Sequence, residues 1–174
     1  MVKSCPILFL GILKNMNCLN CLILEGEINP PCGIIYKSDK IAVCHNLEHL
    51  IPGYLLLFPI RHVESYHELT CDEAANLSLV MRKTVALLSG IEGVERVYIN
   101  SFGEETRHLH FHLFPRYKWM LDNSDILQNG KIDAIQIFDK LRKEMYVGRS
   151  KMETSEILNV TGHIRERLSS SLDI

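Results

Sequence analysis

The segment from His108 to Arg116, which reads HLHFHLFPR, places three histidines at alternate positions. Successive side chains of a β-strand point to opposite faces, so the three imidazoles share one face and the large apolar side chains between them share the other. The segment is therefore predicted to be a strand with one face available for chemistry and the other in the core. No other segment of the chain concentrates so many imidazoles on one predicted element.

Four further strands are indicated by runs of apolar and β-branched residues. Residues 34–36 and 41–44 flank a short polar turn and predict a hairpin. A continuous apolar run over 54–58, ended by Pro59, is typical of a buried strand. Residues 94–99 alternate and are rich in β-formers, which predicts a strand that precedes the histidine segment.

Helices are predicted between and after these strands. Thr70 and Glu73 have the spacing of a capping box, so a helix is expected to begin just after Thr70 and to end at Gly90. Two amphipathic patterns follow in the C-terminal third, one formed by Ile135, Phe138, Leu141 and Met145 and the other by Ile157, Val160, Ile164 and Leu168. Both helices are expected to pack on the core or on a second subunit.

The chain of 174 residues is long enough for one domain with a substantial core. Its formal net charge of −2 provides no basic field, so a nucleic-acid polymer is not an expected partner. No apolar run approaches the roughly 20 residues that cross a bilayer, and the run from Pro6 to Leu13 lacks a signal-peptide cleavage site. Six scattered cysteines do not indicate a disulfide framework. We therefore expect a cytoplasmic protein without a membrane partner.

The alternating histidines are compatible with several kinds of site. Residues two apart on a strand are separated by roughly 6.5 to 7 Å, so His108 and His112 are expected to lie about 13 Å apart, too far to share one metal easily. The spacing instead suits an extended anionic substrate, whose phosphorus is attacked by the central imidazole while a neighbour bonds the phosphate oxygens. The structural alternatives are a polar sheet face or a set of pH-responsive groups. A cupin-like metal site requires an all-β barrel, which the predicted helices oppose.

At these residues the chain resembles the histidine-triad (HIT) superfamily of nucleotide hydrolases and transferases. Residues 108–116 fit the family pattern of three histidines separated by apolar residues, and the Pro-Arg ending is similar to that of the dinucleoside polyphosphate hydrolase branch. Further matches occur in the family's order: Cys18-Leu19-Asn20-Cys21, Gly26-Glu27-Ile28, Pro52-Gly53, Pro59-Ile60-Arg61-His62-Val63 and Asn100. We therefore predict a HIT-like domain over 15–118, an N-terminal extension over 1–14 and a C-terminal helical extension over 119–174.

The resemblance implies an α+β fold with a five-stranded antiparallel sheet and flanking helices, and a homodimer in which two sheets join. It implies cleavage at the α-phosphorus of a nucleoside phosphate derivative, and no organic cofactor is expected. His110 would be the nucleophile that carries the nucleotidyl group, while His112 and Asn100 would hold the substrate. Asn46 stands where relatives often carry an aspartate that binds the ribose hydroxyls. Backbone amides near Gly103, together with His112, are expected to stabilise charge on the phosphoryl oxygens.

Cys18 and Cys21 form a Cys-x-x-Cys pair, which taken alone is compatible with buried thiols, a redox pair or half of a metal site. In zinc-containing relatives the remaining ligands are a histidine after the Pro-x-x-His strand end and the first histidine of the triad, here His62 and His108. The resemblance thus implies a structural zinc ion that attaches the N-terminal segment to the catalytic strand. The first histidine would then face the metal, and the other two the substrate.

The chain also departs from the family pattern. Glu104 and Glu105 stand where many members carry Gln-Ser or Gln-Thr, and two carboxylates there are expected to repel phosphate. Tyr54 replaces the histidine that often follows Pro-Gly in the nucleotide-binding branch, and the loop from Asn100 to His108 is shorter. Three hypotheses follow: a hydrolase or nucleotidyl transferase acting on adenine nucleotide derivatives, a nucleotide sensor with little turnover, and a zinc-stabilised interaction protein that functions through its C-terminal helices.

Overall fold

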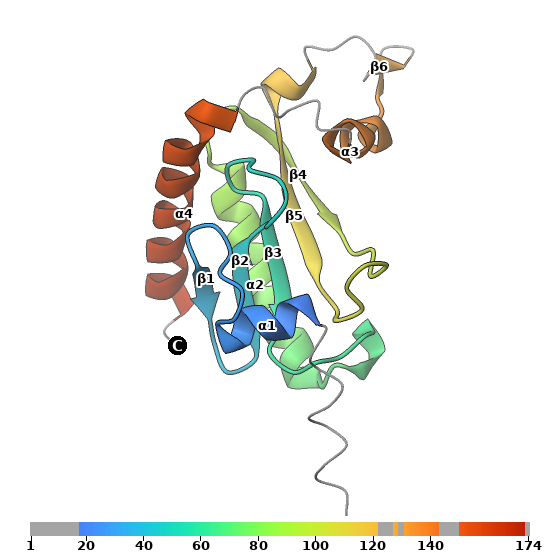
Figure 1. The fold of residues 1–174 in the computed structure, drawn as a ribbon, viewed down its shortest axis with the longest axis vertical. Helices are drawn as coiled ribbons and strands as arrows, with labels where there is room; N and C mark the ends of the chain where they lie inside the picture. The colour runs from blue at the N-terminus through green and yellow to red at the C-terminus, as the bar shows by residue number, and fades with distance from the viewer. Residues whose placement is uncertain (1–17, 122–126, 129–130, 143–149, 173–174) are drawn as a thin grey trace, which may run out of the picture.

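A five-stranded antiparallel sheet in the order β1-β2-β3-β5-β4 forms the centre of the protein (Figure 1). The computed structural model describes residues 18–121, 127–128, 131–142 and 150–172. The strands are β1 (Ile34–Lys37), β2 (Ile41–His45), β3 (Leu55–Pro59), β4 (Val94–Asn100) and β5 (Phe111–Tyr117), and a short ribbon pairs β6 (Leu127–Gln128) with β7 (Lys131–Ile132). Each strand of the main sheet overlaps one expected from the sequence, so the predicted α+β fold is confirmed.

Helices pack on both faces of this sheet. The helices α2 (Cys71–Ser89) and α4 (Ser150–Leu172) share one core with side chains of the strands, among them Val43, Leu57 and Leu113. The opposite face carries α1 (Leu19–Glu25) over β2 and β3, and α3 (Ala134–Arg142) beside β4 and β5 (Figure 1). Two 3₁₀ turns, η1 (Tyr66–Glu68) and η2 (Lys118–Leu121), follow β3 and β5. Among the described helices, none is both long and apolar enough to span a membrane.

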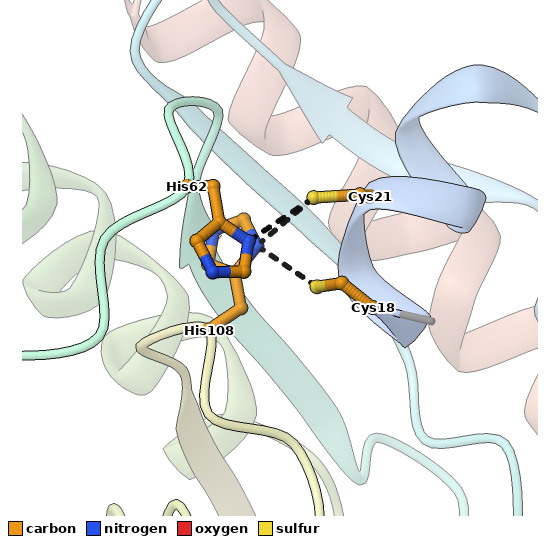
Figure 2. Close-up of side chains that lie close together, drawn as sticks. All are labelled: Cys18, Cys21, His62 and His108. Carbon is orange, nitrogen blue, oxygen red and sulfur yellow. Dashed lines mark hydrogen bonds between the residues drawn. The ribbon is translucent and has the colours of Figure 1, made fainter. Parts of the chain in front are cut away.

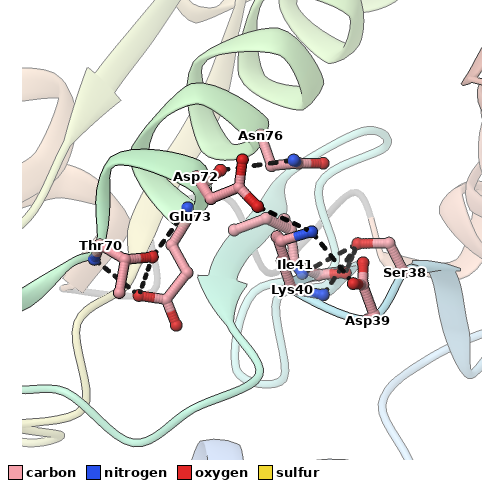
Figure 3. A network of polar contacts seen from close by, with 8 residues as sticks. All are labelled: Ser38, Asp39, Lys40, Ile41, Thr70, Asp72, Glu73 and Asn76. Atoms are coloured by element: carbon pink, nitrogen blue, oxygen red, sulfur yellow. Dashed lines mark hydrogen bonds and ion pairs between the residues drawn. The ribbon is translucent and has the colours of Figure 1, made fainter.

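The first turn of α2 is fixed by the expected capping box (Figure 3). The Glu73 backbone N–H donates to Thr70 Oγ1 at 3.2 Å, and the Thr70 backbone N–H donates to the Glu73 carboxylate at 2.8 Å. Arg61 donates twice to the same carboxylate, at 2.9 and 2.7 Å, and so attaches the segment after β3 to this helix. These donors, Arg61 foremost, lower the pKa of Glu73 to about 2. Lys40 pairs with Asp72 at 3.4 Å and joins the β1–β2 turn to the same end of α2.

The histidine strand begins later than the sequence pattern predicts. The ladder between β3 and β5 starts at Phe111, so His108 and His110 precede the strand and only His112 lies on it. Before this point the Leu109 backbone N–H donates to the carbonyl of Val63, in the loop after β3, at 2.7 Å, so Leu109 pairs outside the ladder. The prediction that all three histidines lie on one strand is therefore wrong, because the strand begins at Phe111, after the first two of them.

The buried residues of the C-terminal helices agree only in part with the two amphipathic patterns predicted from the sequence. Ile157, Ile164 and Leu168 of α4 are buried as expected. In α3 the expected core residue Phe138 packs against Tyr98 of β4 and Phe114 of β5 as predicted, but Ile135 is 78% exposed and Ile137, two residues further on, is buried instead. The packing surface offered by those strands, and not the spacing of apolar residues alone, sets the buried side of α3. Met145 and the expected extension over 1–14 lie outside the described residues.

Candidate functional site

Four potential metal ligands from three separate segments meet beside β3 (Figure 2). Cys18 and Cys21 come from the start of α1, His62 from the loop after β3, and His108 from the segment before β5. Their ligand atoms all lie within 4.8 Å of one another. The structure thus brings together all four residues that the sequence implicates in metal binding.

The geometry of this cluster fits a tetrahedral ion. Zinc binds sulfur at about 2.3 Å and imidazole nitrogen at about 2.0 to 2.1 Å, which places neighbouring sulfur and nitrogen ligands about 3.6 Å apart in a tetrahedral site. The Nδ1 atom of His108 lies 3.5 Å from Cys18 Sγ and 3.6 Å from Cys21 Sγ, and His62 Nδ1 lies 3.3 Å from Cys21 Sγ. The Cys2His2 donor set and its spacing are therefore suited to a closed structural site.

His108 is oriented towards the two thiols by a hydrogen bond on its other ring nitrogen. Its Nε2 atom lies 3.0 Å from the carbonyl oxygen of Pro59, the last residue of β3. Burial, and then the neighbouring His62, lower the pKa of His108 to about 4. The ring is therefore neutral at pH 7, carries its proton on Nε2 and turns the Nδ1 lone pair to the cysteines, as a metal-binding histidine does.

His110 is held in a second, different way. Its Nδ1 atom lies 2.8 Å from the carbonyl oxygen of His108, and the residue is only 8% exposed. In the tautomer whose Nδ1–H donates to that carbonyl, Nε2 is the ring nitrogen that carries the lone pair. This is the tautomer that a nucleophilic imidazole needs, with its lone pair on the nitrogen away from the backbone.

His112 lies beside His110, with ring centroids 4.9 Å apart. Its Nδ1 atom contacts the hydroxyl of Tyr54 at 2.9 Å. Burial, then His110 and His49, lower the pKa of His112 to about 4, so this ring is also neutral at pH 7. The two histidines are thus held by different partners.

Asn100 stands opposite His112 in the β4–β5 register, which puts the two side chains on the same face of the sheet. Its amide nitrogen Nδ2 is buried and has no hydrogen-bond partner among the described residues. A buried donor without a partner costs roughly 1 to 3 kcal/mol. The arrangement accordingly provides a donor beside the two histidines that an oxygen-rich ligand can satisfy.

The other expected substrate contacts lie in two loops. Asn46 is 6% exposed and its Oδ1 accepts the backbone N–H groups of Glu48 and His49, at 3.0 and 2.8 Å, so the side-chain oxygen shapes the loop after β2. Gly103 has φ +71° in the loop between β4 and the histidines. Glu104 and Glu105, in the same loop, are exposed. The contact of these residues with substrate stays a prediction.

Three supporting groups were not identified as such from the sequence. In the sequence Tyr54 stands out only as a departure from the family pattern, and no local signal predicts its contact with His112. The Pro59 carbonyl that orients His108 is a backbone atom and leaves no sequence signal. The Arg61–Glu73 pair, at 2.7 Å, fixes the residue next to His62, and only the capping-box role of Glu73 was predictable.

Comparison with known proteins places this site in a known family. A model of the HIT domain matches residues 27–119. An uncharacterised HIT-like protein of Methanocaldococcus jannaschii is 29% identical over 132 residues, which cover 74% of this chain and 98% of that protein. The asymmetrical bis(5'-nucleosyl)-tetraphosphatase of Schizosaccharomyces pombe is 25% identical over 133 residues, which cover 70% and 71% of the two chains. The crystal structure of a Zn-bound histidine triad family protein from Mycobacterium smegmatis has a TM-score of 0.51 at 19% identity, over 79% of this chain and 99% of that one. With more than half of its residues matched by the family model and the histidine segment at the expected place, the chain belongs to the HIT-domain family.

Proposed function

We propose that the protein is a nucleotide phosphohydrolase or nucleotidyl transferase that cleaves at the α-phosphorus of an adenine nucleotide derivative. The observation that carries this proposal is the 2.8 Å contact between His110 Nδ1 and the His108 carbonyl, which leaves Nε2 ready to act as a nucleophile. The similarity to a bis(5'-nucleosyl)-tetraphosphatase supports the substrate class.

In the proposed reaction the Nε2 lone pair of His110 attacks the α-phosphorus. A P–N bond forms, the P–O bond to the leaving group breaks, and its electron pair goes to the leaving oxygen. Water, or another acceptor in a transferase, then attacks the same phosphorus and loses its proton, and the P–N electron pair returns to Nε2. His112 and Asn100 would donate to the phosphoryl oxygens as charge develops there, with backbone amides near Gly103. The Asn46 amide nitrogen would bind a ribose hydroxyl.

The proposal includes a structural zinc at Cys18, Cys21, His62 and His108. The 3.3 to 3.6 Å spacing of sulfur and nitrogen supports it, as does the neutral, oriented His108 ring. The ion would attach α1 to the segment that carries the nucleophile and would take no part in bond breaking. No organic cofactor is needed for the proposed chemistry.

We propose a homodimer as the functional state, with two sheets joined through β4. This strand is an edge of the sheet and exposes Ile99, which is 48% accessible. The other edge strand, β1, contacts α4, which restricts its access to a partner sheet. A cytoplasmic location, and the absence of nucleic-acid and membrane partners, stay predictions.

One observation favours a second function, that of a nucleotide sensor with little turnover. Glu104 and Glu105 are both exposed in the loop that precedes the histidines. Two carboxylates near the phosphate position would weaken binding of a charged transition state. Such a protein would bind nucleotide and release it largely uncleaved.

The two functions are separated by incubating the protein with a pool of adenine nucleotide derivatives and following AMP release. The pool contains dinucleoside polyphosphates, an adenosine phosphoramidate, a nucleotide sugar and ATP. We expect AMP from at least one compound, and a loss of at least 10³-fold in H110A. H163A, which removes an exposed histidine on α4, is the matched control. Equal AMP release by wild type and H110A would exclude the covalent reaction, and binding without turnover would favour the sensor.

A further inference from the structure

Tyr54 connects the loop after β2 to the third histidine of the site. Its hydroxyl oxygen lies 2.9 Å from Nδ1 of His112, and the residue is only 4% exposed. We propose that Tyr54 is a positioning residue, which fixes His112 as a neutral imidazole with its proton on Nε2 and aims that N–H at the substrate phosphate. The proposal rests on the proposed function for its consequence in turnover, although the tautomer itself does not depend on it.

The chemistry of the two groups sets the direction of the hydrogen bond. A phenol hydroxyl both donates and accepts, whereas a neutral imidazole offers one N–H and one lone pair. The phenol proton is the more acidic of the two, and the imidazole lone pair is the better acceptor. The Tyr54 O–H therefore donates to Nδ1, which leaves the only ring proton of His112 on Nε2.

Tyr54 can determine the tautomer of His112 because contacts of its backbone and of its ring hold it in place. Its backbone N–H donates to the Ile51 carbonyl at 3.0 Å, and its carbonyl accepts from the Asn46 N–H at 2.8 Å. The ring packs edge-on against Phe114 with centroids 5.1 Å apart, and it stacks parallel to His49 at 6.2 Å. A buried phenol held at both its backbone and its ring does not swing away when the imidazole rotates.

The residue before Tyr54 also constrains the loop. Gly53 has φ +74°, and a Cβ at this position would approach the Leu88 side chain to 2.8 Å, so the turn into β3 tolerates only glycine without rearrangement. The Pro52 carbonyl accepts from the Tyr117 hydroxyl at 2.8 Å. The turn that carries Tyr54 therefore packs closely against Leu88 of α2 and is hydrogen-bonded to Tyr117, the last residue of β5.

The tautomer matters because of what faces the substrate. With Nε2 protonated, His112 adds a donor beside the buried amide of Asn100, its register partner, and both suit phosphoryl oxygens. With the proton on Nδ1 instead, the Nε2 lone pair would face an anionic phosphate and repel it. A hydroxyl at residue 54 thus selects the productive form of His112 without adding a charge to the site.

The test compares wild type, Y54F and the control Y36F, which removes a tyrosine hydroxyl on β1, away from the histidines. Long-range ¹⁵N NMR of the imidazoles, with His112 assigned from a H112Q sample, reports the tautomer without any need for turnover. We expect the Nε2–H form in wild type and Y36F, and a substantial Nδ1–H population in Y54F. We also expect Y54F to lower kcat/KM for AMP release about tenfold, the worth of one hydrogen bond, and to lower the melting temperature by only a few degrees, so that the variant stays folded in the assay.

The outcomes separate this inference from the proposed function. The Nδ1–H form of His112 in wild type, or an identical tautomer in wild type and Y54F, would overturn the role of Tyr54 even if the protein is active. The expected change of tautomer in a protein that releases no AMP would support the role of Tyr54 and contradict the proposed reaction. A tautomer change with full activity in Y54F would show that the hydroxyl does not serve turnover and would overturn that part of the inference.

Discussion

The Nε2 atom of His108 lies 3.0 Å from the carbonyl oxygen of Pro59, and this contact turns the opposite ring nitrogen to Cys18 and Cys21. The first histidine is thereby separated from its two neighbours in the motif. His110 is oriented by a carbonyl of its own segment and His112 by a phenol. Three residues of one type thus have different hydrogen-bond partners, and we assign them different tasks.

The metal content of the protein follows from the cysteine and histidine cluster. Purified wild type is expected to contain about one equivalent of zinc, and C21S less than about a tenth of an equivalent, because the variant lacks a thiolate ligand. C71S is the control, since Cys71 is exposed at the start of α2. Metal analysis of the three proteins measures this. Zinc-free wild type that takes up no added zinc would contradict the assignment.

Zinc removal is also expected to lower the melting temperature. A ligand present at 1,000 times its dissociation constant stabilises the native state by about 4 kcal/mol, which corresponds to roughly 10 °C for a chain of this size. Calorimetry before and after chelation, with C21S as the variant that should not respond, measures the shift. An equal response of wild type and C21S to the chelator would show that the stabilisation does not come from this cluster.

The Arg61–Glu73 contact predicts a specific dependence of stability on pH. The pKa of Glu73 is lowered from 4.5 to about 2, so its stabilising contribution is fully present above pH 4.5 and is lost as the pH falls towards 2. E73Q is expected to lower the free energy of unfolding by about 1 to 2 kcal/mol at pH 7. The difference from wild type should shrink between pH 5 and pH 2 in urea titrations.

D72N provides the matched control for this experiment. Asp72 lies in the same helical turn, but its side chain is 78% exposed, so solvent screens its pair with Lys40. D72N should therefore change stability little and without the same acid dependence. An E73Q effect that is constant from pH 7 to pH 2 would contradict an ionised, paired Glu73.

Glu104 and Glu105 are expected to weaken nucleotide binding. Removal of both charges in E104Q/E105Q should tighten AMP binding about threefold at low ionic strength and less at 0.5 M salt, because exposed charges are screened. E92Q/E166Q removes the same net charge at exposed positions away from the histidines. Calorimetric titration with AMP at two salt concentrations measures the affinities of wild type and of both double variants. Equal affinities of the two double variants would attribute the effect to net charge alone.

The sequence predicts the sheet well because its strands are marked by local signals. The capping box at Thr70 and Glu73 places the start of α2 correctly, since both partners lie within one turn. The buried side of α3 is not predictable in this way. Phe138 packs against β5 as its spacing predicts, but Ile135, which has the same spacing, is exposed and Ile137 is buried instead, because the strand contacts that decide this are distant in the sequence.

The site shows the same division between local and long-range information. The family resemblance names the four clustered ligands, but periodicity places His108 and His110 on the strand, where the structure does not. The deviation coincides with a backbone hydrogen bond between Leu109 and Val63, which pairs two loops that are distant in the sequence. The Tyr54 contact with His112 joins residues 58 positions apart and follows from the β3–β5 pairing, which no local pattern reveals.

The covalent role of His110 is tested most directly by trapping the intermediate. Protein is mixed for milliseconds with an α-³²P-labelled dinucleoside polyphosphate, quenched in alkali, which preserves a P–N bond, and digested for peptide mapping. We predict one adenylyl group on the peptide that contains residues 108–116, with no label in H110A and normal labelling in H163A. Label on another peptide, retention of label in H110A, or AMP release without any trapped label would contradict the account.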